Sequence, residues 1–174
     1  MRFLGIDPGA SGGVALLDDS GAILHAQAMP QTPTDVADAI RAWAIGDAGT
    51  ETYATLERVQ AWAGSPMGKA ACFAFGRGYG HLEMALLMLE LPHQIIPPQK
   101  WQAYLNCLTH GDKAVTKACA QRLWPRHKIT HAIADALLIA EYGRRTHQGP
   151  HGEKESRKEQ VEASSARRRR TEHP

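Results

Sequence analysis

The sequence predicts an α/β fold whose mixed sheet has three antiparallel strands followed by parallel strands, with helices on its faces. Three short apolar runs separated by turn residues stand at the start of the chain, as in a β-meander. Helical and strand patterns then alternate as far as residue 142. A meander followed by alternating helices and strands indicates a mixed sheet flanked by helices.

The meander is marked by its turns. Phe3 to Ile6 is the first apolar run, Val14 to Leu17 resumes the strand pattern, and Ala22 to Ala28 follows an Asp-Ser-Gly turn. Proline, glycine and serine between residues 8 and 13 are the residues that reverse a chain. We therefore expect a hairpin and a third antiparallel strand.

The remaining elements follow from periodicity and capping residues. Thr34 is expected to cap a helix that is apolar at helical spacing through Trp43. The later elements are a strand over 52–56, a long helix over 67–89, a strand over 93–96, and helices over 97–104, 112–124 and 129–142. Gly76, Gly78 and Gly80 interrupt the long helical pattern, and we expect them to start the helix proper or to permit the close approach of a backbone.

Asp7 ends the first strand, within the stretch FLGIDPGASGGVALLD over 3–18. A carboxylate there is costly to desolvate unless it is paired or bound to a cation. We therefore expect Asp7 to face a metal, a phosphate or solvent. The alternative is that it caps the turn by accepting backbone N–H groups.

Two further acids stand in comparable positions. Glu57 ends the strand over 52–56, and Asp135 interrupts the apolar helix ITHAIADALLIAEYG one turn after His131. By itself, the pair His131 and Asp135 favours a structural hydrogen bond that holds the helix to the core. Three clustered acids without a cation would repel one another, and oxygen ligands suit Mg²⁺ or Mn²⁺.

Composition limits the class of protein. A chain of 174 residues with 43% hydrophobic content suffices for one well-buried domain and is too short for two. It has no apolar run near the ~18 residues that cross a bilayer and no signal-peptide pattern. Three cysteines without metal-type spacing favour a reducing compartment. We expect a cytoplasmic protein.

Charge is distributed unevenly along the chain. Residues 1–57 contain two basic and eight acidic side chains, whereas residues 58–145 contain eleven basic and five acidic ones. Basic residues gathered on one face release counterions from a phosphate backbone, so the middle of the chain points to a polyanionic partner. A solvated basic surface is the plainer explanation for any single lysine.

The last segment has a different composition. Residues 146–174 contain almost no aliphatic side chains and include four consecutive arginines, Arg167 to Arg170. Such a segment cannot bury enough apolar surface to fold alone. We predict a folded domain over 1–145 and a disordered basic tail over 146–174, which either contacts nucleic acid nonspecifically or simply solubilises the chain.

Five segments in the same chain resemble one family. The DPG hairpin, ATLERVQ, FGRGYGHLEMALLMLELP, IIPPQKWQ and HAIADALLIAEYG together resemble the RuvC-type Holliday junction resolvases, particularly their small phage-like relatives, over about residues 3–142. This resemblance implies a ribonuclease H-like fold, a homodimer, and a crossover junction endodeoxyribonuclease that resolves four-way DNA junctions by metal-dependent, paired nicking.

The resemblance also implies site residues. Asp7, Glu57 and Asp135 match three catalytic positions of the family, and the fourth, one helical turn before the last acid, is Asp, Glu or His among relatives. Here His131 stands four residues before Asp135 and Ala132 three before. Two Mg²⁺ or Mn²⁺ ions about 4 Å apart would activate water and stabilise the leaving oxygen. Asp7 would bridge them, Glu57 and Asp135 would each hold one, and His131 would ligate an ion or orient the water.

DNA contacts are expected from basic residues in the middle of the chain. Arg77, Lys100, Lys113 and Lys117 are candidate phosphate contacts, which position DNA without reading its sequence. Trp62 is the best candidate for stacking at an opened junction, ahead of Phe73 and Phe75. The leucines and methionines of the long helix cover several of its sides, and some are candidates for a dimer interface, with core packing as the alternative.

Two other classes compete with a nuclease. A noncatalytic branched-DNA-binding protein with an eroded nuclease site would also keep the fold. The presence of His131 and Ala132, with no acid, one turn before Asp135 leaves this alternative open. An ATP-binding protein of the sugar-kinase and actin type also begins with an Asp-containing glycine hairpin. Those proteins bind nucleotide between two domains, for which this chain is too short.

Overall fold

The structure is a computed structural model that describes residues 1–45, 50–59, 68–109 and 111–147. The chain divides into two compact units, Met1–Arg144 and Arg145–Pro174, and the account below concerns the first. Trp62 and residues 148–174, with the run Arg167 to Arg170, lie outside the described residues. The stacking role of Trp62 and the disorder of the tail therefore stay predictions.

The described strands form one mixed five-stranded sheet. They are β1 (Arg2–Asp7), β2 (Gly13–Asp18), β3 (Ile23–Ala28), β4 (Thr52–Glu57) and β5 (His93–Ile96). Their spatial order is β3-β2-β1-β4-β5. The pairs β1–β2 and β2–β3 are antiparallel, whereas β1–β4 and β4–β5 are parallel. The predicted sheet, with three antiparallel strands followed by parallel ones, is confirmed.

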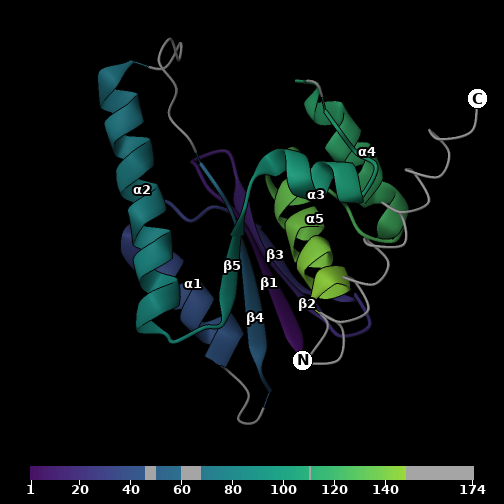
Figure 1. Ribbon diagram of the computed structural model, residues 1–174, viewed down its shortest axis with the longest axis horizontal. Helices are drawn as coiled ribbons and strands as arrows, with labels where there is room; N and C mark the ends of the chain where they lie inside the picture. The colour runs from purple at the N-terminus through teal and green to yellow at the C-terminus, as the bar shows by residue number, and fades with distance from the viewer. Residues whose placement is uncertain (46–49, 60–67, 110, 148–174) are drawn as a thin grey trace, which may run out of the picture. The chain divides into compact units, whose positions relative to one another are not determined.

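Helices cover both faces of this sheet. They are α1 (Pro33–Ile45), α2 (Lys69–Met88), α3 (Pro98–Tyr104), α4 (Lys113–Leu123) and α5 (His131–Thr146). Figure 1 shows α1 and α2 on one side of the sheet and α3, α4 and α5 on the other. No helix in the described part of the chain is both long and apolar enough to cross a membrane.

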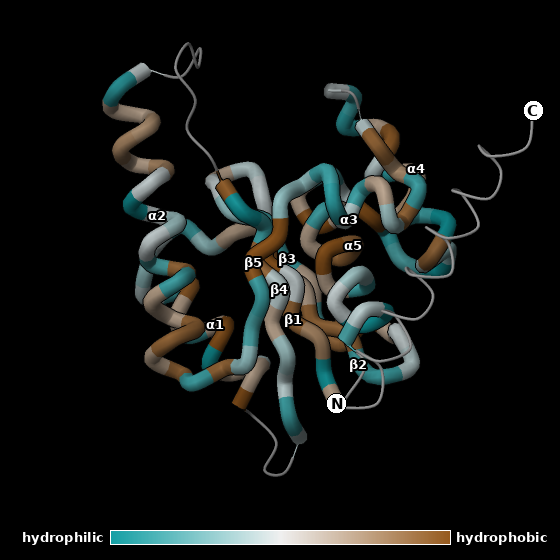
Figure 2. The backbone as a smooth tube through the Cα atoms, in the orientation of Figure 1, coloured by the Kyte–Doolittle hydropathy of each residue, from teal (hydrophilic) through white to brown (hydrophobic). Residues whose placement is uncertain are grey.

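Side chains alternate along each strand, so successive residues point to opposite faces of the sheet. On β1, Leu4 and Ile6 pack in a cluster with residues of α1 and α2. On β2, Ala15 and Leu17 pack in a second cluster with residues of α3, α4 and α5. Hydrophobic stretches are visible on the central strands and on α1 and α5 in Figure 2. Odd-numbered residues of β1, including Asp7, therefore face the α5 side.

The helix α5 approaches the sheet closely because glycine stands opposite it. A Cβ atom at Gly5 of β1 would collide with the backbone of Ala136 and Ala140, and one at Gly13 of β2 would collide with the carbonyl oxygen of Ala132. Glycine at these two positions therefore lets the helix backbone lie against the strands. This contact brings the first turns of α5 to the ends of β1 and β2.

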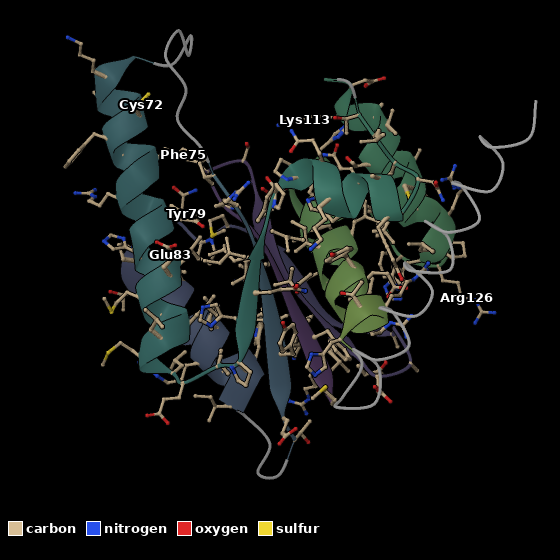
Figure 3. All side chains as sticks on the ribbon, in the orientation of Figure 1. Cys72, Phe75, Tyr79, Glu83, Lys113 and Arg126 are labelled. Atoms are coloured by element: carbon tan, nitrogen blue, oxygen red, sulfur yellow. The ribbon has the colours of Figure 1, made fainter. Side chains whose placement is uncertain are left out.

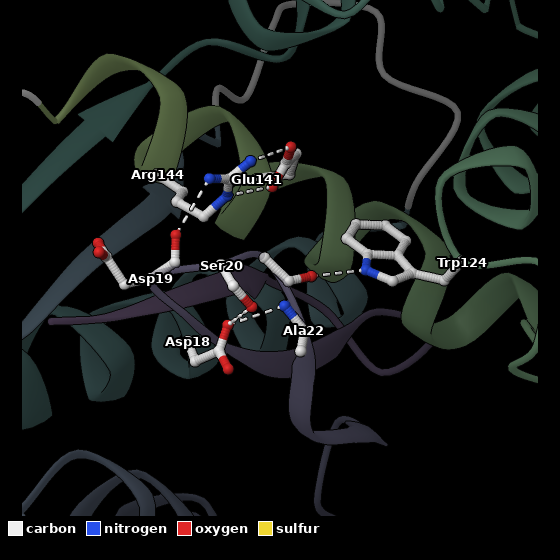
Figure 4. A network of polar contacts seen from close by, with 8 residues as sticks. Asp18, Asp19, Ser20, Ala22, Trp124, Glu141 and Arg144 are labelled. Atoms are coloured by element: carbon white, nitrogen blue, oxygen red, sulfur yellow. Dashed lines mark hydrogen bonds and ion pairs between the residues drawn. The ribbon is translucent and has the colours of Figure 1, made fainter.

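The far end of the same helix is held by a polar network (Figure 4). Arg144 donates to both carboxylate oxygens of Glu141, at 2.7 and 2.8 Å, and to the carbonyl oxygen of Asp19 at 3.2 Å. The indole N–H of Trp124 donates to the carbonyl oxygen of Gly21 at 2.8 Å. Both contacts tie the C-terminal helices to the turn between β2 and β3.

Two details differ from the sequence prediction. The residue that caps α1 is Thr32, whose hydroxyl accepts a hydrogen bond from the Asp35 backbone N–H at 3.1 Å, so the prediction of Thr34 was wrong. The two threonines share the same cap chemistry, and the Thr32 hydroxyl also donates a hydrogen bond to the Asp35 carboxylate at 2.8 Å.

The glycines of α2 do not start that helix. It begins at Lys69 and continues through Gly76, Gly78 and Gly80, so the interruption predicted there was wrong. Glycine costs a helix only about 1 kcal/mol per residue, and the burial of Leu82 and Leu86 offsets this cost. Apart from the adjoining residues and the backbone of α2 itself, no described atom lies within 4 Å of where a Cβ would stand at these three glycines. An approach by DNA or a second subunit stays a prediction.

Candidate active site

Two of the predicted acids lie side by side because their strands are parallel neighbours. Ile6 of β1 pairs with Leu56 of β4, so Asp7 and Glu57, each one residue later, end the two strands together. Residues at equal register on neighbouring strands point to the same face of a sheet. Thr55, two residues before Glu57, faces Gly143 of α5. Asp7 and Glu57 therefore both lie on the α5 side.

The third acid reaches the same place from α5. Asp135 lies next to Ala136, whose backbone rests against Gly5 of β1. The charges of Asp135 and Glu57 both act on Asp7, and the charge of Asp135 acts on Glu57. The fold thus brings all three acids into one electrostatic cluster, which we call the carboxylate cluster.

Burial dominates the electrostatics of this cluster. It raises the pKa of Asp7 to about 8, helped by the charges of Glu57 and Asp135 and opposed by Lys113. It raises the pKa of Glu57 to about 7, opposed by a hydrogen bond from Trp101 and helped by the charge of Asp135. Burial and mutual repulsion oppose the ionisation of these three carboxyl groups, and a bound cation would stabilise their ionised form.

The pKa of Asp135 is raised for the same reason. Burial raises this pKa, while a hydrogen bond from Thr116 and the charges of Lys113 and His131 lower it. The Thr116 hydroxyl has a second acceptor in the carbonyl oxygen of Lys113 at 3.3 Å, and its single proton serves one acceptor at a time.

One atom of the carboxylate cluster is without a partner. Among the described residues, Oδ1 of Asp135 is the buried side-chain polar atom that has no hydrogen bond. A buried oxygen without a partner costs free energy unless an ion or water satisfies it. Hard oxygen donors and an unpartnered carboxylate oxygen fit a Mg²⁺ or Mn²⁺ ion. Within the same residues, however, no three His, Cys, Asp or Glu side chains already stand as a metal-binding group.

The predicted fourth position is beside the cluster. His131 is the first residue of α5 and is exposed. Its charge acts on Asp135, as expected for a residue one turn earlier on the same helix. Ala132 directs its backbone carbonyl at Gly13. His131 therefore lies near Asp135, and its role as a ligand stays a prediction.

Of the predicted DNA contacts, the structure brings one to the carboxylate cluster. Lys113 opens α4 and is exposed, and its charge lowers the pKa of both Asp7 and Asp135; it is labelled in Figure 3. Lys117 is half-buried one turn later on α4, whereas Arg77 on α2 and Lys100 on α3 are exposed. The cluster therefore has a lysine at its edge.

Two residues near the cluster escaped the sequence interpretation. Trp101 is fully buried and donates its indole N–H to Glu57 across 44 positions of sequence. Thr116 on α4 acts on Asp135. Trp101 lies in the segment IIPPQKWQ, which is one of the segments that carry the resemblance. No local pattern shows that its N–H reaches the end of β4, because that contact depends on the parallel pairing of β4 with β5.

The sheet has three antiparallel strands followed by parallel strands and is flanked by helices, and this arrangement defines a ribonuclease H-like fold. No protein-family model matches the chain, and no curated protein does.

Two solved structures of RuvC from Thermus thermophilus share this fold. The first has a TM-score of 0.56 and 18% sequence identity, and the match covers 83% of this chain and 96% of that one. The second, determined in complex with a Holliday junction substrate, has a TM-score of 0.60 and 16% identity, covering 84% and 97%. The expected ribonuclease H-like fold and the similarity to RuvC are thereby confirmed.

Proposed function

We propose that this protein is a structure-selective endonuclease that resolves four-way DNA junctions by paired nicking, with Mg²⁺ or Mn²⁺ held by Asp7, Glu57 and Asp135. The observation that carries the proposal is the buried carboxylate cluster, built from β1, β4 and α5. It is supported by the fold shared with RuvC, one structure of which holds a Holliday junction.

The cluster fits the chemistry of phosphodiester hydrolysis. Two divalent ions, when bound, generate the water nucleophile and stabilise the charge on the attacking and leaving oxygens. Asp7 is the residue that we would assign to both ions, because the charges of both Glu57 and Asp135 act on it. Burial of the acids excludes bulk water, which strengthens every charge interaction inside the site.

Basic residues around the cluster would place the DNA. Lys113, whose charge already acts on Asp7 and Asp135, is the best candidate to neutralise the phosphate that is cut. Arg77, Lys100 and Lys117 would contact the phosphates farther along the backbone, which sets the position of DNA and carries no sequence information. Phe73, which is 73% exposed on the first turns of α2, would be available to a splayed base.

Paired nicking requires two active sites, so the proposal includes a homodimer. The helix α2 has an apolar surface in addition to the buried side that packs on the sheet: Met84, Leu87 and Met88 are 55%, 59% and 74% exposed. Met84 and Met88 also line a groove of about 270 Å³, together with other residues of α1 and α2 and the adjoining Leu89. Burial of such a patch by a second copy of the chain would remove it from water.

The alternative is a branched-DNA-binding protein without catalysis. It is favoured by one observation, that within the described residues no three potential ligands stand as a ready metal group. A nicking assay separates the two functions. The wild-type protein should cut synthetic four-way junctions with Mg²⁺ or Mn²⁺ and leave a linear duplex of the same sequence intact. Tight junction binding without cleavage in either metal would establish the noncatalytic function.

A further inference from the structure

Trp101 makes a polar contact that its packing role does not require. It lies on α3, is 0% exposed, and donates its indole N–H to Oε2 of Glu57 at 2.7 Å. Topology explains the contact. Glu57 pairs with Ile96 at the end of β5, and α3 begins two residues after Ile96, so the helix starts beside the end of β4.

A buried indole N–H needs an acceptor, and a main-chain carbonyl is sufficient. Trp124 shows this in the same protein, because its N–H donates to the carbonyl oxygen of Gly21 at 2.8 Å. The N–H of Trp101 instead meets a carboxylate of the cluster. Hydrogen bonds to a charged acceptor are shorter and about twice as strong as neutral ones.

The contact has a geometric consequence for Glu57. It fixes the carboxylate through one oxygen, which restricts its rotation and leaves the lone pairs of the other oxygen for an ion. The contact therefore favours the oriented carboxylate that a metal ligand needs.

We propose that Trp101 is a positioning residue, whose indole N–H holds the Glu57 carboxylate in the orientation that binds a divalent ion. This inference rests on the proposed function, because it takes Glu57 as a ligand. Outer groups that orient a ligand typically change metal affinity 10- to 100-fold.

The test uses Trp101→Phe, which keeps most of the ring and removes the N–H donor. Trp124→Phe is the matched control, since it removes a buried indole N–H of similar hydrogen-bond length away from the cluster. The dissociation constant for Mn²⁺ is measured by calorimetry in the absence of DNA. Folding of each variant is checked by circular dichroism and thermal unfolding.

We expect Trp101→Phe to weaken Mn²⁺ binding roughly 10-fold or more and Trp124→Phe to leave it within about twofold, although both lose stability through the lost hydrogen bond. If Trp101 acts through Glu57, its substitution should have no further effect in a Glu57→Gln background, because the two changes then report one interaction. Cleavage of junctions by Trp101→Phe should fall in kcat with an unchanged KM.

The outcomes distinguish failure of the positioning role of Trp101 from failure of the proposed function. If Glu57→Gln weakens Mn²⁺ binding and Trp101→Phe does not, the positioning role is overturned and the proposed function stands. An equal loss for Trp101→Phe in the Glu57→Gln background also overturns it. If the wild-type protein binds no Mn²⁺, the proposed function fails and the positioning role with it.

A second measurement does not depend on the folding of Trp101→Phe. The indole N–H resonances of the wild-type protein are followed by NMR and assigned by elimination with phenylalanine variants of the other tryptophans. The Trp101 resonance should move with Glu57→Ala and during a Mg²⁺ titration, while the Trp124 resonance stays fixed. A Trp101 resonance that is insensitive to both would overturn the proposal.

Discussion

Asp7 and Glu57 end two neighbouring parallel strands at the same register, and the charge of Glu57 raises the pKa of Asp7. The two acids lie together because β1 and β4 run in the same direction, so that their C-terminal ends lie at the same end of the sheet. The charge of Asp135, on α5, raises the pKa of both Asp7 and Glu57.

The first prediction concerns Asp7. Asp7→Asn should lower the cleavage rate of four-way junctions at least about 100-fold, because the ions it would bridge supply several kcal/mol of charge stabilisation and 1.36 kcal/mol corresponds to a factor of ten. Junction affinity should stay within about threefold, since phosphate contacts come from basic residues. Single-turnover cleavage and gel-shift titration measure the two quantities.

Asp38→Asn is the control for this variant, because Asp38 is an exposed residue of α1 that pairs with Arg41. It should cut as the wild-type protein does. Equal losses of binding and cleavage in Asp7→Asn would refute the assignment of the chemical step to Asp7 and of junction affinity to the basic residues.

The second prediction is a pH dependence of stability in metal-free protein. The folded state raises the pKa of Asp7 from 3.8 to about 8 and that of Glu57 from 4.5 to about 7, so it holds protons that the unfolded chain releases. The contribution of these groups to stability is therefore greatest below the ordinary pKa values and is lost as pH rises through about 7 to 8.

Asp7→Asn isolates this effect, because the amide does not ionise. Its Tm should match that of the wild-type protein near pH 4 and exceed it by about 3 °C or more near pH 8.5. Saturating Mg²⁺ should close the gap by stabilising only the wild-type protein. Thermal unfolding at several pH values measures this, and a Tm difference that is independent of pH would contradict the coupling of Asp7 to the cluster.

The third prediction tests His131, which is exposed at the start of α5. If it ligates an ion, His131→Asp should keep or raise cleavage with Mg²⁺, because a carboxylate suits Mg²⁺ better than an imidazole does. His131→Ala should impair cleavage with both Mg²⁺ and Mn²⁺. Parallel assays in the two metals measure the preference, and a wild-type rate for His131→Ala would show that three acids suffice.

The fourth prediction concerns the polar network that ties α5 to the turn between β2 and β3. The Glu141 carboxylate is 4% exposed and Arg144 is 25% exposed in the ion pair that they form. Arg144→Met should lower the free energy of unfolding by about 2 to 4 kcal/mol, since it takes a guanidinium away from a buried carboxylate. Denaturant unfolding measures the change.

The exposed pair of Arg41 and Asp38 provides the comparison, with side chains 59% and 62% exposed. Arg41→Met should cost less than about 1 kcal/mol, because solvent screens such pairs. If the two variants lost equal stability, burial of Glu141 would not be the source of the effect.

The sheet could be predicted from the sequence because its signals are local. The apolar runs of β1 and β2, and the Asp-Ser-Gly turn before β3, each lie within a few residues, and alternation then fixes which side chains share a face. The acids Asp7 and Glu57 were predicted at strand ends for the same reason. Where two residues with the same chemistry stood close together, as Thr32 and Thr34 do, the cap was misplaced.

The amino-acid sequence by itself determined the strands and helices, the three acids at the ends or on the face of their elements, and the basic middle of the chain. The tertiary structure decided that the charge of Asp135 acts on Asp7, because α5 lies against Gly5. It also decided that Trp101 donates to Glu57 and that Lys113 reaches the cluster. The interactions of Asp7 with Asp135, of Trp101 with Glu57 and of Lys113 with Asp7 join residues 44 or more positions apart. Strand pairing and helix packing set them, and no local pattern carries that information.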